Sequence, residues 1–362
     1  MNIKETIRKY SEEIGIEAIG FCKAEIDTKR LLIYEERKSS GLQCDLEVVE
    51  GLENKIDPSN HLFGAKTFLV ILQSYRLEAD THISPGMGTV SKSANFIDYH
   101  TLIKDKLALL QGYLEAQYGS QSIAYCDQSP FSDRQIAYEA GLGVIGRNSF
   151  LIHEQFGCAV YIGYLLTDLE IEDYEGASQV EYCKDCHLCV DACPNEAILG
   201  NGQINAKRCL SYLTQSKNIE AIHKEVMGIS LYGCDICQLV CPKNEAQNNQ
   251  VFEPIVPSQV DLKALLELKN DVFKRTFGRT ASGWRGKKLL QRNAIIALGN
   301  IKTKESVKVL SMHTNDPRED IRREIVDSLG RIRSEAALRV LDEMIKIEKN
   351  EAIMQMIRAY LS

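Results

Sequence analysis

A chain of 362 residues exceeds the size of one typical domain, so two or three domains are expected. The hydrophobic content of 44% suffices for packed cores, and the net charge of −7 argues against nucleic acid as a partner of the chain as a whole. Residues 1–19 alternate charged and apolar residues instead of forming a secretory signal, and no apolar run approaches the roughly 20 residues that a membrane span needs. We therefore expect a cytoplasmic protein with no membrane partner.

The first 170 residues alternate predicted helices and strands. Apolar residues at helical spacing predict a first helix, which Gly15 ends before a short strand at 18–22. A helix-rich stretch then extends to about residue 54, and a loop lies at Asp57-Pro58. The later elements are a buried strand at 67–75, a loop rich in serine, glycine and threonine at 81–95, a helix at 99–118, a strand at 122–126, a turn at 128–130, a helix at 133–140, and strands at 149–153 and 158–166. This alternation predicts an α/β or α+β domain.

Three glycines in this region, Gly141, Gly143 and Gly146, match the G-x-G-x-x-G fingerprint of dinucleotide-binding proteins. The fingerprint needs a strand before it and a helix after it, whereas here a predicted helix precedes it and an apolar strand follows. We therefore interpret these glycines as helix-capping and loop residues.

Two cysteine runs lie in the middle of the chain. The first, from Cys183 to Cys193, has gaps of two, two and three residues, and both it and the second run, from Cys234 to Cys241, end before a proline. This pattern is typical of ferredoxin-like proteins with two 4Fe-4S clusters, because thiolates bind iron and the last cysteine of each run reaches the neighbouring cluster. Disulfides or structural zinc are the alternatives, but disulfides need an oxidising compartment and zinc needs only two separated cysteine pairs.

The spacing also predicts which cysteines share a cluster. The second run lacks a first cysteine, and Cys209 is the only other cysteine in this segment, so Cys209 is the natural remaining ligand. One cluster is then bound by Cys183, Cys186, Cys189 and Cys241, and the other by Cys193, Cys209, Cys234 and Cys237. No role is assigned to the remaining cysteines, which we expect to be reduced core thiols: Cys22, Cys44, Cys126 and Cys158.

From Leu262 onward the pattern is helical, after a linker that Pro254 and Pro257 interrupt. Segments that end in Gly299 and Gly330 repeat at an interval of 31 residues, each as the closing turns of an apolar helix that glycine ends. Helix pairs of about this length are typical of a small HEAT-like solenoid. The alternative is a chance Leu-Gly pair in two unrelated helices.

Residues 272–304 contain nine basic residues and no acidic one, although the whole chain is acidic. Phe273, Phe277 and Trp284 lie among the cations. Such a segment attracts phosphates, and its guanidinium and indole groups can stack on unpaired bases, so we expect an RNA-binding face. RNA is favoured over duplex DNA because no helix-turn-helix or zinc-finger pattern accompanies the segment; a solvated basic face without a partner is the alternative.

These motifs together resemble the epoxyqueuosine reductases of queuosine-tRNA synthesis, nearly from end to end. The matching segments are Asp98-Tyr99-His100, Tyr125-Cys126-Asp127 with Pro130 and Arg134, residues 140–149, the cysteine runs with residues 209–215, and Trp284-Arg285-Gly286 with residues 292–300. The resemblance implies an α+β multidomain protein: an α/β cobalamin-binding catalytic domain (1–170), a ferredoxin-like two-cluster domain (171–250) and an all-α HEAT-like domain that binds tRNA (258–362).

The implied reaction reduces the epoxide of epoxyqueuosine at the tRNA wobble position, in the anticodon stem-loop, to give queuosine. An external low-potential donor would supply electrons through the two 4Fe-4S clusters to cobalamin. Asp127 matches the family's proton donor, which near neutral pH would need a pKa raised by burial against the cofactor. Without the resemblance, an aspartate before a turn is more often a cap for local amides.

The resemblance also implies binding residues. Positions that match the family's cobalamin contacts are Lys55, Lys92, Asp127, Asn148, Ser149, Leu151, Ser211, Gln215, Lys217, Gly233 and Asp235. Lys55 and Lys92 depart from the family pattern, in which arginine is usual. His100 is not assigned to cobalt, because the family binds cobalamin without a protein histidine on the metal. The expected tRNA contacts are Arg275, Arg279, Trp284, Arg285, Lys287, Lys288 and Arg292.

Two other functions fit parts of this pattern. Reductive dehalogenases have similar cobalamin and cluster domains, but they generally carry a twin-arginine export signal and lack a basic helical-repeat tail, the opposite of this chain. A plain iron-sulfur electron carrier or RNA-binding scaffold would leave Asp127 and the whole amino-terminal domain without a role.

Overall fold

The computed structural model describes residues 2–25, 28–47, 51, 55–127, 129–178, 180–244 and 249–362. The chain forms two compact units, each assembled from three stretches of sequence. The first unit contains Met1–Glu78, Ile97–Cys209 and Asp235–Glu253, and the second contains Ala79–Phe96, Leu210–Cys234 and Pro254–Ser362. The division predicted from the sequence, at 1–170, 171–250 and 258–362, stays a prediction.

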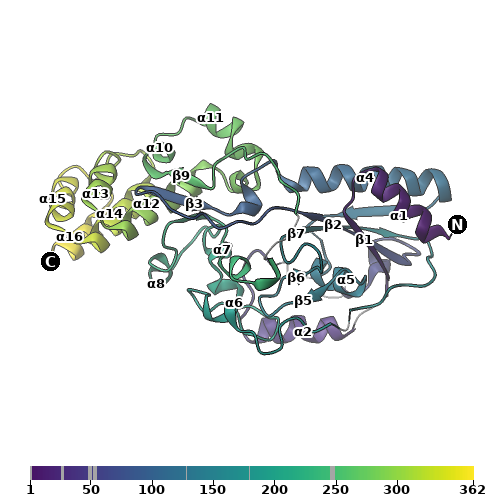
Figure 1. Ribbon diagram of the computed structural model, residues 1–362. Coiled ribbons are helices and arrows are strands. Elements are labelled where there is room, and N and C mark those ends of the chain that lie inside the picture. Colours follow the sequence, from purple (N-terminus) through teal and green to yellow (C-terminus); the bar gives the residue numbers. More distant parts are fainter. Residues whose placement is uncertain are drawn as a thin grey trace. The chain divides into compact units, whose positions relative to one another are not determined.

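A four-stranded antiparallel sheet forms the centre of the first unit (Figure 1). Its strands, in spatial order, are β1 (Ala18–Lys23), β2 (Thr67–Ser74), β7 (Val160–Thr167) and β4 (Ser122–Tyr125). Every residue of β2 is buried, because helix α4 (Tyr99–Tyr118) covers one face of the sheet and helix α5 (Asp133–Glu139) packs on the other. Phe68, Val70 and Leu72 alternate along β2 and share an apolar core with Ile136 of α5. The mixture of helices and strands predicted for this part of the chain is confirmed.

Helix α1 (Ile3–Glu13) lies alongside α4 (Figure 1). It begins at a capping box, in which Asn2 Oδ1 accepts a hydrogen bond from Lys4 N and the Glu5 carboxylate accepts one from Asn2 N. The rings of Tyr10 in α1 and Tyr113 in α4 stack with their centres 3.9 Å apart. The predicted first helix is therefore confirmed, and it ends at Glu13.

The rest of the first unit consists of one further helix, α2, and of short elements, some of which belong to the cysteine runs. They are α2 (Thr28–Ser39), η1 (Pro58–Asn60), β5 (Val144–Ile145), β6 (Leu151–Ile152), α6 (Leu188–Asp191), η3 (Ala206–Arg208), α9 (Ile236–Leu239) and η4 (Pro242–Asn244). Helix α5 precedes the glycine motif, strand β5 lies within it and strand β6 comes next, so the rejection of a dinucleotide fingerprint is confirmed. Parts of two predicted elements, residues 48–50 and 52–54 of the helix-rich stretch and residue 128 of the turn, lie outside the described residues.

The second unit contains a three-stranded sheet in which β3 (Met87–Val90) lies between β8 (Ser230–Tyr232) and β9 (Gln259–Asp261). The prediction of a loop over 81–95 is therefore wrong at β3 and at the 3-10 turn η2 (Lys92–Ala94). Strand β3 pairs in parallel with β8 and antiparallel with β9, both far away in the sequence. Local composition does not reveal a strand that depends on such distant partners.

Helices make up the remainder of the second unit. They are α7 (Leu210–Leu213), α8 (Ala221–Lys224), α10 (Leu262–Leu266), α11 (Asn270–Arg275), η5 (Phe277–Arg279), η6 (Ala281–Gly283), α12 (Lys287–Ile301), α13 (Lys304–Ser311), α14 (Glu319–Ile332), α15 (Glu335–Met344) and α16 (Glu351–Leu361). Helices α12, α14 and α16 pack one against the next, with α13 and α15 beside them, which confirms the predicted helical repeats (Figure 1). Within the ranges that the structure describes, no helix is long and apolar enough to cross a membrane.

The repeated glycines do not end their helices, contrary to the prediction. Helices α12 and α14 each continue for two residues beyond the glycine, to Ile301 and Ile332. A Cβ atom at Gly299 would overlap Ser328 Oγ, and one at Gly330 would overlap the ring of Tyr360. Glycine is needed at these positions because neighbouring helices approach closely there, not because the chain must turn.

Candidate functional site

A histidine held between two carboxylates lies at the amino-terminal end of α4. Asp98 caps this helix: its Oδ1 accepts a hydrogen bond from His100 N at 3.0 Å and lies 2.7 Å from His100 Nδ1. The other ring nitrogen, Nε2, lies 3.2 Å from Oδ2 of Asp127. Both nitrogens of the imidazole are thus in contact with carboxylate oxygens, an arrangement that stabilises the protonated ring.

Asp127 follows strand β4 in a left-handed backbone conformation, with a φ of 59°. This conformation is uncommon outside glycine and often marks a functional position. The hydroxyl of Tyr99 donates a hydrogen bond to Asp127 Oδ2, the same oxygen that faces His100. The Tyr99 ring stacks on both His100 and Tyr161, with ring centres 4.2 Å apart in each case. The Asp127 side chain is 49% exposed, so another molecule can reach it.

These contacts set the charges of the pair. Hydrogen bonds with Asp127 and then Asp98 raise the pKa of His100 from 6.5 to about 9. Burial acts to raise the pKa of Asp127, but hydrogen bonds from His100 and Tyr99 outweigh it and hold that pKa below its ordinary value. The raised pKa expected for Asp127 depends on burial against the cofactor and stays a prediction; the protein's own donors, His100 and Tyr99, act in the opposite direction. Near neutral pH the pair is an imidazolium and a carboxylate.

A second carboxyl group lies near Asp127. Asp133 is the first residue of α5, and its buried Oδ1 has no hydrogen-bond partner among the described residues. Burial and then the negative charge of Asp127 raise the pKa of Asp133 to about 7. No role was predicted for Asp133, and no sequence signal indicated one. For Asp98, its position directly before a long predicted helix was a signal that could have indicated a capping carboxylate beside His100.

Three predicted cofactor contacts lie on or beside the β5–β6 hairpin. Ser149 is left-handed, with a φ of 66°, and its carbonyl oxygen accepts a hydrogen bond from Arg134 Nη1 at 2.8 Å. Asn148 is buried and donates from Nδ2 to Cys237 O at 3.4 Å, which links the hairpin to the second cysteine run. Leu151 belongs to the apolar core. Contact of these residues with a cofactor stays a prediction.

The remaining predicted cofactor contacts are divided between the units. In the first unit, Lys55 Nζ lies 5.0 Å from the centre of the Tyr34 ring, and burial lowers the pKa of Lys55. Asp235, also in the first unit, directly precedes α9. In the second unit, Lys92 Nζ lies 2.7 Å from Oδ1 of Asp80. Both lysines therefore have partners within their own units.

Four cysteines of the first predicted cluster gather in the first unit. Burial raises the pKa of Cys189, and the charges of Cys183, Cys241 and Cys186 add to this increase. Such mutual repulsion is relieved when thiolates bind positively charged iron, so these four side chains fit the predicted cluster. Across the described ranges, no three His, Cys, Asp or Glu side chains are grouped tightly enough for a single metal ion. A cubane spaces its ligand sulfurs more widely than a single ion does.

The predicted ligands of the second cluster are divided between the two units of the chain. Cys193, Cys209 and Cys237 belong to the first unit, and Cys234 ends a segment of the second. Cys193 Sγ accepts a hydrogen bond from Ala197 N at 3.2 Å, and such bonds to sulfur are one means by which proteins tune iron-sulfur clusters. The assignment of these four ligands stays a prediction.

In the second unit, a hydrogen-bond network connects three predicted cofactor contacts. Gln215 donates from Nε2 to Ser211 O at 2.9 Å, and its Oε1 accepts a hydrogen bond from Trp284 Nε1 at 2.9 Å. Gly233 donates its N–H to Thr214 Oγ1, also at 2.9 Å. The segment that contains Ser211 and Gln215 is therefore fixed both to Trp284 and to the turn at Gly233.

Helix α12 holds the same segment through a buried amide. Asn293 donates from Nδ2 to Thr214 O and to Leu231 O, both at 2.8 Å. Further along α12, Asn300 donates in the same way to two carbonyl oxygens, those of Lys224 and Gly228, at 2.9 and 2.8 Å. Two asparagines of one helix thus support two different loops of the second unit.

Arg292, a predicted tRNA contact, uses its guanidinium within the second unit. Its Nη1 donates to Ser216 O at 2.6 Å and to Lys217 O at 3.0 Å. Burial lowers the pKa of Arg292 to about 10. Because these bonds occupy the side chain, we leave Arg292 out of the tRNA contacts proposed below.

The other predicted tRNA contacts differ in their pairing. Lys288 pairs with Asp320 at 2.7 Å, Arg275 pairs with Asp271 at 2.9 Å, and Lys287 Nζ donates to Leu268 O at 2.9 Å. The guanidinium carbon of Arg285 lies 4.1 Å from the centre of the Trp284 ring, and Trp284 is 50% exposed. Arg279 is exposed as well. Arg279, Trp284 and Arg285 are therefore the members of the basic segment best suited to an external partner.

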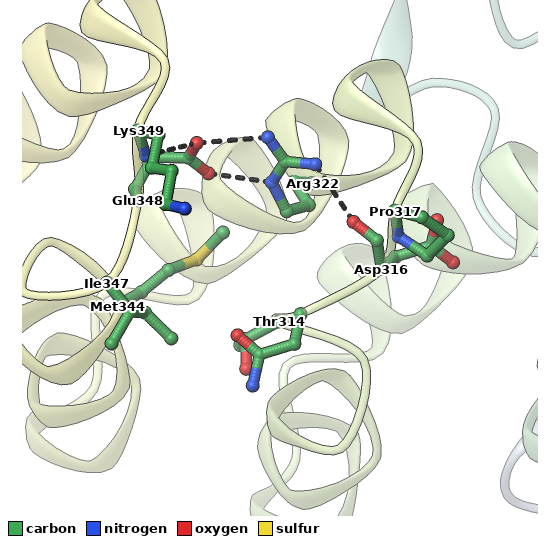
Figure 2. A pocket seen from close by; sticks show the side chains of 9 residues that line it. Thr314, Asp316, Pro317, Arg322, Met344, Ile347, Glu348 and Lys349 are labelled. Atoms are coloured by element: carbon green, nitrogen blue, oxygen red, sulfur yellow. Dashed lines mark hydrogen bonds and ion pairs between the residues drawn. The ribbon is translucent and has the colours of Figure 1, made fainter.

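A cavity of about 230 Å³ lies at the far end of the helical repeats. Figure 2 shows that Arg322 lies along one side of it, between Glu348 and Asp316; Arg322 pairs with Glu348 at 2.7 Å, and its Nη1 donates to Asp316 O at 2.9 Å. Arg322 also lowers the pKa of Glu348 to about 2. The Glu348 carboxylate pairs with Arg322 and the Asp316 carboxylate pairs with Arg318, so neither is suited to act as an acid or a base near neutral pH.

Three successive parts of the chain match known protein families. Residues 55–128 match the family model for "epoxyqueuosine reductase QueG", residues 182–244 match a 4Fe-4S double cluster binding domain, and residues 286–361 match HEAT repeats. The chain is 34% identical to the epoxyqueuosine reductase of Listeria monocytogenes, over 99% of this chain and 96% of the relative. It is 32% identical to that of Bacillus subtilis, over 96% and 92% of the two chains.

Solved structures give the same result. The fold matches an epoxyqueuosine reductase crystallised with an epoxyqueuosine-modified tRNA-Tyr stem loop, with a TM-score of 0.92 and 30% identity, over 99% of this chain and 98% of the other. It also matches the epoxyqueuosine reductase of Streptococcus thermophilus, with a TM-score of 0.88 and 32% identity, over the same shares of the two chains.

Proposed function

Because the chain belongs to the epoxyqueuosine reductase family, we propose that it reduces epoxyqueuosine in tRNA to queuosine. The observation that carries this proposal is the similarity over 99% of the chain to a reductase solved with its modified tRNA stem loop. The exposed acid–base pair of His100 and Asp127 supports it independently. Neither a plain electron carrier nor an RNA-binding scaffold needs such a pair.

The reaction has a simple balance. Both carbon–oxygen bonds of the epoxide break, an alkene remains, and the oxygen leaves as water after it takes up two electrons and two protons. Iron-sulfur clusters pass electrons one at a time, at potentials that the protein tunes over roughly −700 to +450 mV. Cobalamin, when bound, supplies the low-potential metal chemistry at the substrate, and the protein supplies position and protons.

The pair of His100 and Asp127 is the proposed source of the first proton. At neutral pH the pair holds one transferable proton, which is on His100 and can move across the 3.2 Å contact to Asp127. Asp98 fixes the orientation of the ring through Nδ1, and Tyr99 donates to the same Asp127 oxygen. An exposed Asp127 can then protonate the leaving oxygen. Asp133, whose pKa lies at about 7, is the proposed source of the second proton.

The side chains available to the cofactors fit their chemistry. Cys183, Cys186, Cys189 and Cys241 would hold one cluster, and Cys193, Cys209, Cys234 and Cys237 the other. Cobalamin carries amide groups around its ring, and the amides and hydroxyls proposed to bind them belong to Asn148, Ser149, Ser211 and Gln215. Lys55, Lys92, Leu151, Lys217, Gly233 and Asp235 complete the proposed contacts.

The proposed tRNA contacts are Arg275, Arg279, Trp284, Arg285, Lys287 and Lys288. Of these, Arg279, Trp284 and Arg285 are the strongest candidates, because Arg279 and Trp284 are exposed, Arg285 is partly exposed beside Trp284, and guanidinium and indole groups can bind phosphate and stack on bases. An external low-potential protein or small molecule would supply the electrons. Since tRNA is the proposed substrate, we also propose that the enzyme works in the cytoplasm.

Anaerobic turnover tests the proposal. The reconstituted protein is incubated with epoxyqueuosine-containing tRNA and a chemical reductant, with and without cobalamin, and the nucleosides are identified by mass spectrometry. We expect loss of one oxygen atom that depends on cobalamin. If protein that retains both clusters and cobalamin leaves epoxyqueuosine unchanged, the proposal is wrong.

A further inference from the structure

The segment Gly157-Cys158, just before strand β7, is hydrogen-bonded to residues of the second cysteine run and of the turn that follows it. Asn244 Oδ1 accepts a hydrogen bond from Cys158 N at 2.8 Å, and Gln238 Nε2 donates to Cys158 O at 2.8 Å. A Cβ atom at residue 157 would overlap Asn244 Oδ1, so glycine is required for this approach. Both backbone polar groups of Cys158 are therefore fixed to the run that ends at Cys241.

The thiol of Cys158 faces Cys241, a proposed ligand of the first cluster. Cys158 is fully buried and packs in one apolar cluster with Cys183 and Cys241. The contact with Cys241 and burial raise the pKa of the Cys158 thiol, while the contact with Cys158 lowers the pKa of Cys241, as expected where Cys158 is the protonated partner. Asn244 Nδ2 also donates to Cys158 Sγ, at 3.0 Å. Because the amide occupies a lone pair of the Cys158 sulfur, the single S–H proton remains available for Cys241.

We propose that Cys158 is a positioning residue for the cluster held by Cys183, Cys186, Cys189 and Cys241, and that its S–H raises the reduction potential of this cluster. A donor to a ligating sulfur stabilises the negative charge that the cluster gains on reduction, and a buried site strengthens this effect. The inference rests on the proposed cluster ligands, and it does not depend on the substrate. It adds to the electron path a buried thiol that is not itself an iron ligand.

Reduction potentials of variants test this inference. Cys158→Ala, Cys158→Ser and a matched control, Cys22→Ala, are reconstituted, and their iron contents are compared with that of the wild type. Cys22 is also a buried thiol of the first unit, but its Sγ bonds to Ile136 O, at 3.7 Å, in the core beside α5. The potential of each cluster is then measured by redox titration followed by electron paramagnetic resonance, without tRNA.

We expect Cys158→Ala to retain its iron and to shift the potential of one cluster to more negative values, while the other cluster is unchanged. Cys158→Ser, whose hydroxyl can still donate, should shift less, and Cys22→Ala should match the wild type. Full iron content with two unchanged potentials in Cys158→Ala would overturn the inference. If Cys158→Ala loses iron, retention of iron by Cys158→Ser supports the role of the hydrogen bond, and loss in both variants refutes it. These measurements do not involve epoxide reduction. Their outcome therefore stands even if the protein does not reduce epoxyqueuosine.

Discussion

At the scale of single residues, the acid–base pair accounts for the chemistry that this chain can perform by itself. Asp127→Asn removes the group that passes the proton of His100 to the leaving oxygen, while the amide can still accept the Tyr99 hydrogen bond. We expect turnover to fall by about 10²- to 10⁴-fold, the usual contribution of general acid catalysis. Quantification of queuosine by mass spectrometry measures the loss, and visible spectra should show unchanged cluster and cobalamin content.

A matched control for this variant is Asp105→Asn, because Asp105 is an exposed aspartate of α4, the helix that carries Tyr99 and His100. This control should retain wild-type turnover. Wild-type turnover in Asp127→Asn itself would remove the carboxylate from the mechanism.

The pKa of His100 predicts a pH dependence. An unfolded histidine titrates near 6.5, whereas the folded pKa is about 9. Because the folded value is the higher one, the ion pairs of His100 stabilise the fold fully below about pH 6.5, and this contribution is lost as the pH rises through about 9. Turnover should decline over the same alkaline range, since the transferable proton is lost there. A pH–rate profile measures this decline.

Asp98→Asn separates His100 from other groups that titrate at high pH. Asparagine caps a helix as well as aspartate does, so α4 should keep its start. One of the two carboxylates that raise the pKa of His100 is removed, so the alkaline decline should move to lower pH. If turnover of Asp98→Asn declines at the same pH as that of the wild type, the group that titrates is not His100.

The sequence predicted Asp127 and noted the motif that contains Asp98, Tyr99 and His100, but it did not predict the charge of Asp127. That charge depends on two donors from α4 that meet a carboxylate at the end of β4. This contact depends on how helix α4 packs against the strand, and it cannot be predicted from the spacing of the residues in the sequence. Cys158 was left without a role for the same reason, because its contacts come from a distant cysteine run.

At the scale of elements, helix α12 has a structural role that its basic residues did not suggest. Asn293→Ala removes two hydrogen bonds and leaves the carbonyl oxygens of Thr214 and Leu231 without this donor. Each unsatisfied buried group costs about 1–3 kcal/mol, so we expect a lower melting temperature. Because Thr214 lies between Ser211 and Gln215, cobalamin affinity should fall as well. Equilibrium titration with cobalamin measures this affinity.

Asn300→Ala is the matched control, since Asn300 belongs to the same helix and also donates to two carbonyl oxygens, but those of Lys224 and Gly228. It should lower the melting temperature similarly and leave cobalamin affinity close to that of the wild type. Equal losses of affinity in the two variants would mean that only general stability matters.

Element prediction succeeded where a segment carries its own pattern and failed where a partner decides the structure. The helix at 99–118 was predicted, because a long helical pattern is a local signal, although the Asp98 cap at its start was not recognised. Strand β3 was missed, because its residues become a strand only between β8 and β9. The glycines of α12 and α14 were interpreted as helix ends, although they serve the close approach of Ser328 and Tyr360.

At the scale of the whole molecule, the net charge of −7 conceals a local excess of cations. The sequence predicted this segregation, but it could not show which cations are already paired. Lys288 and Arg275 have acidic partners, and Arg292 binds carbonyl oxygens of its own chain. The pair of Arg275 and Asp271 lies within α11, four residues apart. The Lys288 pair and the Arg292 contacts instead depend on the packing of α12 against α14 and of neighbouring loops, so the fold is needed to identify the cations that remain for the proposed tRNA substrate.

Salt dependence of tRNA binding tests this selection. Since the molecule is acidic as a whole, we expect attraction to the proposed tRNA substrate to come from the cations of the basic segment. Replacement of Arg279 and Arg285 by alanine should weaken binding and reduce the slope of log affinity against log salt by about 0.7 to 0.9 for each phosphate that the variant no longer binds. Arg339→Ala is the control, because Arg339 is an exposed arginine of α15 that pairs with Glu335. Fluorescence anisotropy over a range of salt concentrations measures both quantities. If the double variant keeps the wild-type slope, the phosphates are bound elsewhere on the chain, and an equal change in Arg339→Ala would show that any surface arginine contributes.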